Sequence, residues 1–311
     1  MSFPAIPGKS TPFWSVIIPT YNPRADYLEQ TLNSVLAQDV GPEQMQIEVV
    51  DDCSPAVAVE EMVKAIAGSR VVFSKTPKNS GLAGCWNTCI KRAQGEWVHI
   101  LHQDDYVLPG FYQVLAKTAA RHPEVSLLAT RSFFVDAKNV ILGVTGRLGH
   151  LENGGRTVAD FFYSTPIQCP GVVVKRNFYE TFGGFRSDLI FSLDCEMWAR
   201  VIGSAGGLIT SEVLSCYRKS DINETARLSQ TAENLRDLEQ MSRLFAQTYP
   251  EFDVKKAIHR VCHLAIDQAE RFAQIGNLEA AKLSLNYWKA NAPVKFRLRR
   301  LAGSIAKNLF K

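Results

Sequence analysis

The stretch Ala-Gln-Gly-Glu-Trp-Val-His-Ile-Leu-His-Gln-Asp-Asp-Tyr (93–106) decides the fold. Its apolar run, Trp97 to Leu101, follows a glycine and leads into Asp104 and Asp105. A short apolar run bounded by turn residues predicts a buried strand. Because ligands of open α/β sheets bind outside the carboxyl ends of the strands, the two aspartates predict an acidic site at the end of this strand.

The chain on either side of this stretch alternates strand-like and helix-like segments. The predicted strands before it are 15–18, 47–50 and 71–73, and the predicted helices around it are 28–36, 59–66, 84–93 and 111–121. This alternation predicts a doubly wound, mainly parallel sheet. Shorter strand-like runs follow at 126–129, 140–144, 171–174 and 208–209, with a helix near 194–202.

After Asp221 the pattern becomes helical, with one apolar stripe over 228–245, another over 258–272 and a third predicted helix over 278–289. We therefore expect four parts: an N-terminal leader (1–13), a catalytic domain (14–220), a helical extension (221–293) and a basic amphipathic tail (294–311).

Polar residues follow each of the first four predicted strands. They are Pro19-Thr20-Tyr21-Asn22, Asp51-Asp52-Cys53-Ser54, Asn79-Ser80-Gly81 and His102-Gln103-Asp104-Asp105. Each group alone is ordinary turn chemistry. Four groups at one edge of a sheet predict a ligand site.

This edge lacks the glycine-rich loops that bind phosphate through backbone amides. Ile-Pro-Thr-Tyr (18–21) stands where a dehydrogenase would carry Gly-x-Gly-x-x-Gly, and no Gly-Lys-Ser/Thr loop is present. Asp104 and Asp105 offer another route, because carboxylates bind Mg²⁺ or Mn²⁺ and the cation binds phosphates. A metal-dependent nucleotidyltransferase remains an alternative, although its usual glycine-rich first loop is missing.

Several ordered motifs carry a family resemblance. They are Ser-Val-Ile-Ile-Pro-Thr-Tyr-Asn (15–22), Val-Val-Asp-Asp-Cys-Ser (49–54), Asn-Ser-Gly-Leu-Ala-Gly-Cys-Trp-Asn (79–87), the opening stretch extended to Phe111, Gly-Gly-Phe (183–185) and Leu-Asp-Cys-Glu-Met-Trp-Ala-Arg (193–200). Together they resemble the inverting family 2 glycosyltransferases, over about residues 14 to 220. The resemblance implies an α/β, GT-A-type fold: a Rossmann-like, mainly parallel sheet flanked by helices, here followed by a C-terminal helical extension.

The resemblance also implies the activity. The chain would move one sugar from a nucleotide-diphosphate sugar, with a UDP-sugar expected, to a hydroxyl of a glycan or lipid-linked glycan in cell-surface glycan assembly. Asp194 would be the catalytic base, which an acceptor hydroxyl needs. Asp105 would ligate Mg²⁺ or Mn²⁺, which stabilises the leaving diphosphate. The implied donor-binding residues are Pro19, Tyr21, Asn22, Asp52, Asn79, Gly81, Asn87 and Asp104.

The chain departs from the family pattern at three places. Leu193 replaces the glutamate that usually precedes the base, and Trp86 replaces an arginine that often precedes the asparagine at 87. Lys219-Ser220 stands where many members carry a metal-binding histidine, so the third metal ligand is open. The Gln-x-x-Arg-Trp signature of processive synthases is absent, which favours transfer of a single sugar. A non-catalytic nucleotide-sugar-binding relative is a further alternative, against which the presence of Asp105 and Asp194 argues.

The net charge of +4 arises from the basic residues of the C-terminal tail. Residues 294–311 hold six basic residues and no acidic one, so the remaining 293 residues carry −2. Val294, Leu298, Leu301, Ile305 and Leu309 form one apolar stripe there. We favour contact with an anionic membrane surface over a last helix packed on the domain. Nucleic acid is not an expected partner, because no aromatic stacking platform accompanies the charge.

The sequence predicts a cytoplasmic protein, peripheral to the inner face of a membrane if the tail binds lipid. It shows no apolar run of the length that spans a bilayer and no secretory signal. Its seven scattered cysteines fit a reducing compartment and predict small buried side chains rather than a disulfide framework.

Overall fold

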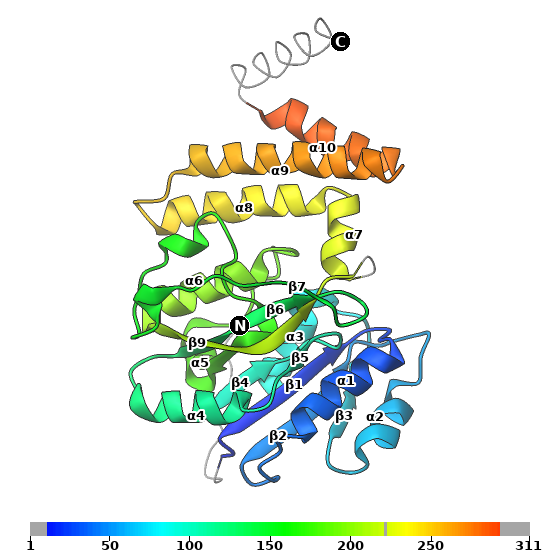
Figure 1. The fold of residues 1–311 in the computed structure, drawn as a ribbon, viewed down its shortest axis with the longest axis vertical. Helices are drawn as coiled ribbons and strands as arrows, with labels where there is room; N and C mark the ends of the chain where they lie inside the picture. Colours follow the sequence, from blue (N-terminus) through cyan, green and yellow to red (C-terminus); the bar gives the residue numbers. More distant parts are fainter. Residues whose placement is uncertain (1–10, 221–222, 293–311) are drawn as a thin grey trace, which may run out of the picture. The chain divides into compact units, whose positions relative to one another are not determined.

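The computed structural model describes residues 11–220 and 223–292. Contacts within these ranges divide the chain into two compact units (Figure 1). The first, the sheet unit, consists of the described parts of Met1–Asp188 and Leu193–Ser220. The second, the helical unit, consists of Leu189–Ser192 and the described parts of Asp221–Lys311. The four residues Leu189–Ser192 therefore group with helices that follow them much later in the chain.

The sheet unit is built on a nine-stranded sheet in the order β3-β2-β1-β4-β8-β6-β9-β5, with β7 paired to β6. The strands are β1 Trp14–Thr20, β2 Met45–Asp51, β3 Val72–Lys75, β4 Trp97–Ile100, β5 Tyr106–Val107, β6 Leu127–Val135, β7 Ile141–Val144, β8 Val172–Lys175 and β9 Gly207–Arg218. Strands β3, β2, β1 and β4 are parallel, as are β6 and β9, whereas β8 is antiparallel to both of its neighbours. The prediction of a mainly parallel α/β sheet is confirmed, with antiparallel β8, β5 and β7 as additions.

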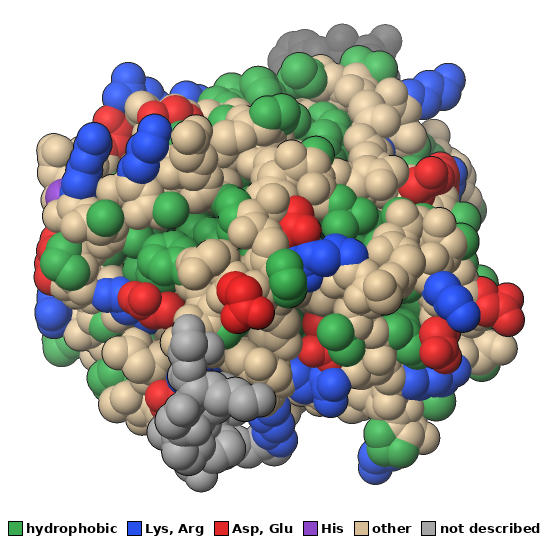
Figure 2. All heavy atoms as spheres, turned by 90° about the horizontal axis from the view of Figure 1, so that it is seen from below, with side chains coloured by type: hydrophobic (Ala, Val, Ile, Leu, Met, Phe, Trp, Pro, Cys, Tyr) green, Lys and Arg blue, Asp and Glu red, His purple; other side chains and the backbone are tan. Residues whose placement is uncertain are grey.

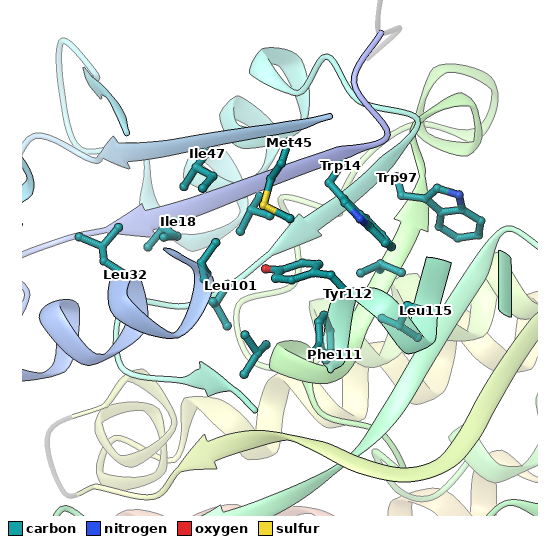
Figure 3. Close-up of a cluster of buried hydrophobic side chains, with 14 of the residues drawn as sticks. Trp14, Ile18, Leu32, Met45, Ile47, Trp97, Leu101, Phe111, Tyr112 and Leu115 are labelled. Atoms are coloured by element: carbon teal, nitrogen blue, oxygen red, sulfur yellow. The ribbon is translucent and has the colours of Figure 1, made fainter. Parts of the chain in front are cut away.

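Helices connect and cover these strands. They are α1 Ala25–Leu36, α2 Val59–Ala67, α3 Gly81–Arg92, α4 Phe111–Arg121, α5 Arg176–Phe182 and α6 Leu193–Ala205, with short 3₁₀ turns η1 Gly149–Leu151, η2 Ala159–Phe161 and η3 Cys169–Gly171. The apolar faces of α1 and α4 pack on β1, β2 and β4, where Leu32, Met45 and Phe111 are fully buried (Figure 3). Burying each such side chain contributes roughly 1.5–3 kcal/mol. Packing in this core therefore holds the strands in position, and with them the loops at their carboxyl ends.

Gly95 shows how tightly the turn into β4 packs on β1. A Cβ at this position would lie 2.5 Å from the carbonyl carbon of Trp14, and no side chain fits at that distance. The glycine therefore allows β4 to begin beside β1, in the register that pairs Trp14 with Trp97.

The helical unit contains α7 Glu224–Gln230, α8 Glu233–Thr248, α9 Val254–Gln274 and α10 Leu278–Asn291. The stripe predicted over 228–245 is split between α7 and α8, because Ala232 adopts a left-handed conformation with φ 56°. The side chains of Asn223, Asp253 and Asn277 accept backbone N–H bonds at the starts of α7, α9 and α10.

No helix of the described residues is long and apolar enough to cross a membrane. On the face of the molecule shown in Figure 2, acidic and basic side chains are interspersed with apolar ones. This face therefore does not present a field of a single sign.

Candidate active site

The loops that follow β1, β2 and β4 are joined sideways by hydrogen bonds. The Tyr21 N–H donates to Gln103 Oε1 at 2.8 Å, and the Gln103 amide donates back to the Tyr21 carbonyl at 3.3 Å. The Asn22 N–H donates to the Ser54 hydroxyl at 2.8 Å. We refer to these joined loops as the loop belt. The structure thus brings the predicted edge residues together at the carboxyl ends of the strands.

Asp52 extends the loop belt to the start of α3. Its buried carboxylate accepts the N–H groups of Ser80 and Gly81 at 2.9 and 3.1 Å, as well as hydroxyl bonds from Ser80 and Thr76. Gly81 has φ 71°, a conformation that glycine adopts without strain. The Asp52 side chain is therefore committed to the backbone of the belt, and its contact with a nucleotide base stays a prediction.

The other predicted donor residues occupy three kinds of position. Tyr21 is 45% exposed, so part of an aromatic residue is accessible at the edge. Asn22 and Asn79 are also exposed, and Pro19 is buried within β1. Asn87 is buried, and its side-chain amide pairs reciprocally with the backbone of Phe185 at 2.8 and 2.9 Å. Asn87 thus fixes a neighbouring loop, and its donor contact also stays a prediction.

Asp104 and Asp105 lie between β4 and β5, as predicted. Asp105 Oδ1 accepts the backbone N–H of Arg218 at 2.8 Å, and its carbonyl accepts the Thr31 hydroxyl at 2.7 Å. The Asp105 carboxylate is buried, and its Oδ2 has no hydrogen-bond partner in the described structure. Burial, reinforced by the charge of Asp105, raises the pKa of Asp104 to about 7.

Arg218 is a buried residue that sequence reasoning did not identify. Its guanidinium donates to the carbonyls of Asp104 and Asp136 at 2.8 and 3.1 Å and to Gln30 Oε1 at 2.6 Å. Its charged group also lies 4.2 Å from the ring centroid of Tyr27. Arg218 therefore holds in place the loop that carries Asp104 and Asp105, which we call the acidic loop. Arg218 ends β9, whose length the short apolar run at 208–209 did not reveal.

His102 lies among the acidic residues of the site. Its Nδ1 is 3.5 Å from Asp105 Oδ2, and its ring stacks on Trp86 at 4.7 Å. Burial lowers the pKa of His102, but the neighbouring carboxylates, including Asp194, outweigh this effect and raise its pKa above the ordinary value. Trp86, one of the departures from the family pattern, thus packs on the histidine of the site. His99 is different: it is buried between Tyr112 and the Pro170 carbonyl, and burial lowers its pKa to about 3.

The carboxylates of the acidic loop are suited to a divalent cation that a substrate would also bind. Asp105 Oδ2 is a hard oxygen that accepts no hydrogen bond in the described structure and has only the His102 ring 3.5 Å away, and such an oxygen is the kind of ligand that Mg²⁺ and Mn²⁺ prefer. The described residues contain no cluster of three or more His, Cys, Asp or Glu side chains able to cage a metal. Mg²⁺ is commonly bound by one or two carboxylates plus phosphates, so a diphosphate would complete such a site.

Asp194 lies in the first turn of α6, and both of its carboxylate oxygens accept a hydrogen bond. Oδ1 accepts the Cys195 N–H at 2.7 Å, and Oδ2 accepts the Cys169 thiol at 3.4 Å. Burial raises the pKa of Asp194, while the Cys195 N–H, the Cys169 thiol and His102 act in the opposite direction. A carboxylate with a raised pKa is a better proton acceptor near neutral pH. Sequence reasoning treated Cys169 only as a buried hydrophobe and missed this contact.

Two further residues keep the surroundings of α6 in place. Arg200 donates to the carbonyls of Gly183 and Gly184 at 3.3 and 2.8 Å and pairs with Glu196 at 2.8 Å. Leu193, which replaces the family's usual glutamate, is buried in the apolar interior.

The tail at Val294–Lys311 lies outside the described residues.

Comparisons with known sequences place these features in a family context. Residues 15–177 match the family described as Glycosyl transferase family 2. An uncharacterized protein of Mycobacterium tuberculosis is 26% identical over 242 residues, 73% of each chain. The Staphylococcus aureus poly(ribitol-phosphate) beta-N-acetylglucosaminyltransferase TarS is 36% identical over 95 residues, which are 30% of this chain and only 16% of that enzyme.

Solved structures share the fold. TarS 1–349 of S. aureus, in complex with UDP-GlcNAc, superposes with a TM-score of 0.56 at 17% identity, covering 89% of this chain and 92% of that one. The mannosyltransferase PcManGT of Pyrobaculum calidifontis, in complex with GDP-Man and Mn²⁺, superposes with a TM-score of 0.55 at 20% identity, covering 97% and 81%.

Proposed function

Because the chain belongs to glycosyl transferase family 2, we propose that it transfers one sugar per encounter, with inversion, from a nucleotide-diphosphate sugar to an acceptor hydroxyl. The observation that carries this proposal is the Asp194 carboxylate. It is half-buried and hydrogen-bonded on both oxygens, and its charge helps to raise the pKa of His102, whose Nδ1 is 3.5 Å from Asp105 Oδ2; this supports a role for Asp194 near the proposed metal ligand.

The reaction follows from these groups. Asp194 accepts the proton of the acceptor hydroxyl while that oxygen forms a bond to the anomeric carbon of the sugar. The bond from the anomeric carbon to the diphosphate oxygen breaks at the same time, and the nucleoside diphosphate leaves. A divalent cation held by Asp105, when bound, would stabilise the negative charge of that leaving group. Displacement from the opposite face inverts the anomeric centre without a covalent intermediate.

The loop belt supports the proposed binding of the donor. The exposed ring of Tyr21 offers a stacking surface for a base, and the backbone around Gly81 lies open at the start of α3. We propose a UDP-sugar as donor, by analogy with TarS, which was solved with UDP-GlcNAc. PcManGT was solved with GDP-Man, so a GDP-sugar is the alternative that the experiment must separate.

The acceptor proposed is a hydroxyl of a glycan or lipid-linked glycan destined for the cell surface. Relatives named for such pathways support this class: TarS, the Bacillus subtilis minor teichoic acid biosynthesis protein GgaB, and the Rhizobium meliloti succinoglycan biosynthesis protein ExoO. The regions of similarity span 16%, 14% and 30% of those proteins, so the acceptor is proposed only as a class.

The test uses the full chain with UDP, GDP, UDP-GlcNAc and GDP-Man, each with Mn²⁺ and with a chelator. Donor binding is read by thermal shift, and turnover is read as release of nucleoside diphosphate. Asp194→Asn should bind donor as the wild type does and lose roughly two to four decades of turnover. Asp188→Asn, which alters an exposed carboxylate paired with Arg186, is the matched control and should keep full turnover.

Two outcomes would overturn the proposal. Donor binding without turnover by the wild-type chain, across the panel and with acceptor glycans present, would indicate a non-catalytic nucleotide-sugar-binding protein. Full turnover by Asp194→Asn would show that the base lies elsewhere.

A further inference from the structure

The four residues before α6 are held by the helical unit. Leu189–Ser192 groups with the C-terminal helices, and Asp237 of α8 makes the polar contacts. The Asp237 carboxylate accepts the Ile190 N–H at 2.5 Å and the Ser192 N–H at 2.8 Å, and it also accepts the Ser192 hydroxyl. Three donors from one short segment therefore converge on one side chain.

Asp237 is buried, with 4% of its surface exposed, and the donors of Ile190 and Ser192 surround its carboxylate. An ionised carboxylate in such a position requires strong hydrogen bonds in place of water. The donors supplied by Ile190 and Ser192 meet that requirement. Removing the carboxylate would leave two backbone N–H groups and a hydroxyl without their acceptor.

Ser192 immediately precedes α6 and has an unusual role there. A serine before a helix normally accepts a backbone N–H of the first turn with its hydroxyl. Here the Ser192 hydroxyl donates to Asp237, which ties the residue before α6 to α8. Asp194 follows only two residues later, and its carboxylate accepts its hydrogen bonds from the Cys195 N–H and the Cys169 thiol, which are both uncharged donors.

We propose that Asp237 is a positioning residue for the catalytic base. By fixing Ser192, it sets where the first turn of α6 begins and thereby aims the Asp194 carboxylate at the acceptor hydroxyl. This inference rests on the proposed function, since it assigns Asp237 a role only in a reaction that uses Asp194. It gives the helical extension a part in catalysis, although the extension follows the residues that match the family.

The test compares Asp237→Asn and Ser192→Ala with the wild type, using the full chain. Asp237→Asn keeps the size of the side chain but weakens its acceptors, whereas Ser192→Ala removes one of the three donors. We expect Asp237→Asn to lower kcat about ten- to a hundredfold, because a misplaced catalytic group loses rate steeply. Ser192→Ala should lower kcat less, and the KM for donor and the thermal shift given by donor should stay unchanged in both. Asp253→Asn, at the start of α9 in the same unit, is the matched control and should keep wild-type kcat.

A folded Asp237→Asn protein with wild-type kcat would overturn the inference, as would a parallel loss of donor affinity, which would indicate general damage. If Asp237→Asn fails to fold, Ser192→Ala decides, and wild-type kcat in that variant overturns the proposal. The two proposals fail separately: inactive Asp194→Asn with fully active Asp237→Asn rejects only the positioning role, whereas active Asp194→Asn rejects the base itself.

Discussion

Replacing Arg218 by methionine should destabilise the sheet unit by about 3 to 5 kcal/mol. Arg218 is 1% exposed, and its guanidinium donates to the carbonyls of Asp104 and Asp136 and to Gln30 Oε1. A hydrogen bond from a charged donor contributes roughly 1.5–3 kcal/mol, so these bonds together would contribute roughly 4.5–9 kcal/mol. Burial of the apolar methionine side chain offsets part of this loss, and methionine carries no charge whose desolvation opposes folding. The expected net loss of stability is therefore about 3 to 5 kcal/mol.

The measurement is urea denaturation followed by tryptophan fluorescence. Four of the five tryptophans, Trp14, Trp86, Trp97 and Trp198, lie in the sheet unit, so the signal reports chiefly on it. A loss of this size is a large share of the roughly 5–15 kcal/mol that stabilises a typical domain, and the midpoint should fall steeply.

Arg186→Met is the control for this experiment. Arg186 also pairs with a carboxylate, that of Asp188, but both side chains are at least 40% exposed. An exposed pair contributes only about 0–1 kcal/mol, so the control should unfold close to the wild type. If Arg218→Met lost less than about 1 kcal/mol, or no more than the control, the buried guanidinium would not be holding the acidic loop.

Three further changes test the metal ligand, the base and the tail. Asp105→Asn should stay folded and lose the Mn²⁺-dependent gain in donor binding, measured by thermal shift with and without chelator; full transfer in chelator-treated buffer would reject Asp105 as the ligand. The Cys169 thiol stabilises the ionised form of Asp194, so Cys169→Ala should raise the pKa of that base and move the acid limb of the kcat–pH profile to higher pH. Cys169→Ser, with a stronger donor, should move the limb to lower pH, and coincident profiles would show that the thiol has no such effect. A chain ending at Pro293 should lose salt-sensitive sedimentation with anionic vesicles, since each of the six basic residues of Val294–Lys311 contributes about 1 kcal/mol at such a surface; equal partitioning of the two forms would count against membrane binding.

The parallel half of the sheet could be predicted because its signals are local. The buried strands β1, β2 and β4 are runs of apolar residues bounded by turns, and Asp104 and Asp105 lie in the loop that follows β4. Because ligands bind at the carboxyl ends of the strands in such sheets, the residues that follow the strands in the sequence could be predicted to form a site. These inferences need no knowledge of contacts between distant residues.

The remainder depends on contacts that sequence patterns do not reveal. Strand β9 continues through Glu212 and Ser215 because β6 pairs with it, and this mixed run does not read as a strand alone. The break between α7 and α8 depends on the left-handed backbone of Ala232, a residue that normally favours helix. The partners of Arg218 and Cys169 lie 25 to 188 residues away, so neither role could be identified by spacing.

The loop belt has a consequence for how the donor preference of this enzyme could change. At the proposed donor site, hydrogen bonds from Tyr21 to Gln103 and from Asn22 to Ser54 join the loops in the structure without a donor. Binding then loses little conformational entropy, and affinity depends on the fit of a largely rigid surface. The same bonds couple the loops during sequence divergence, since a substitution of Gln103 or Ser54 removes the acceptor of a backbone N–H in the loop after β1. A change from one nucleotide to another should therefore demand coordinated replacement of adjacent loops, and a graft of a single loop from a relative should disturb its neighbours before it alters specificity.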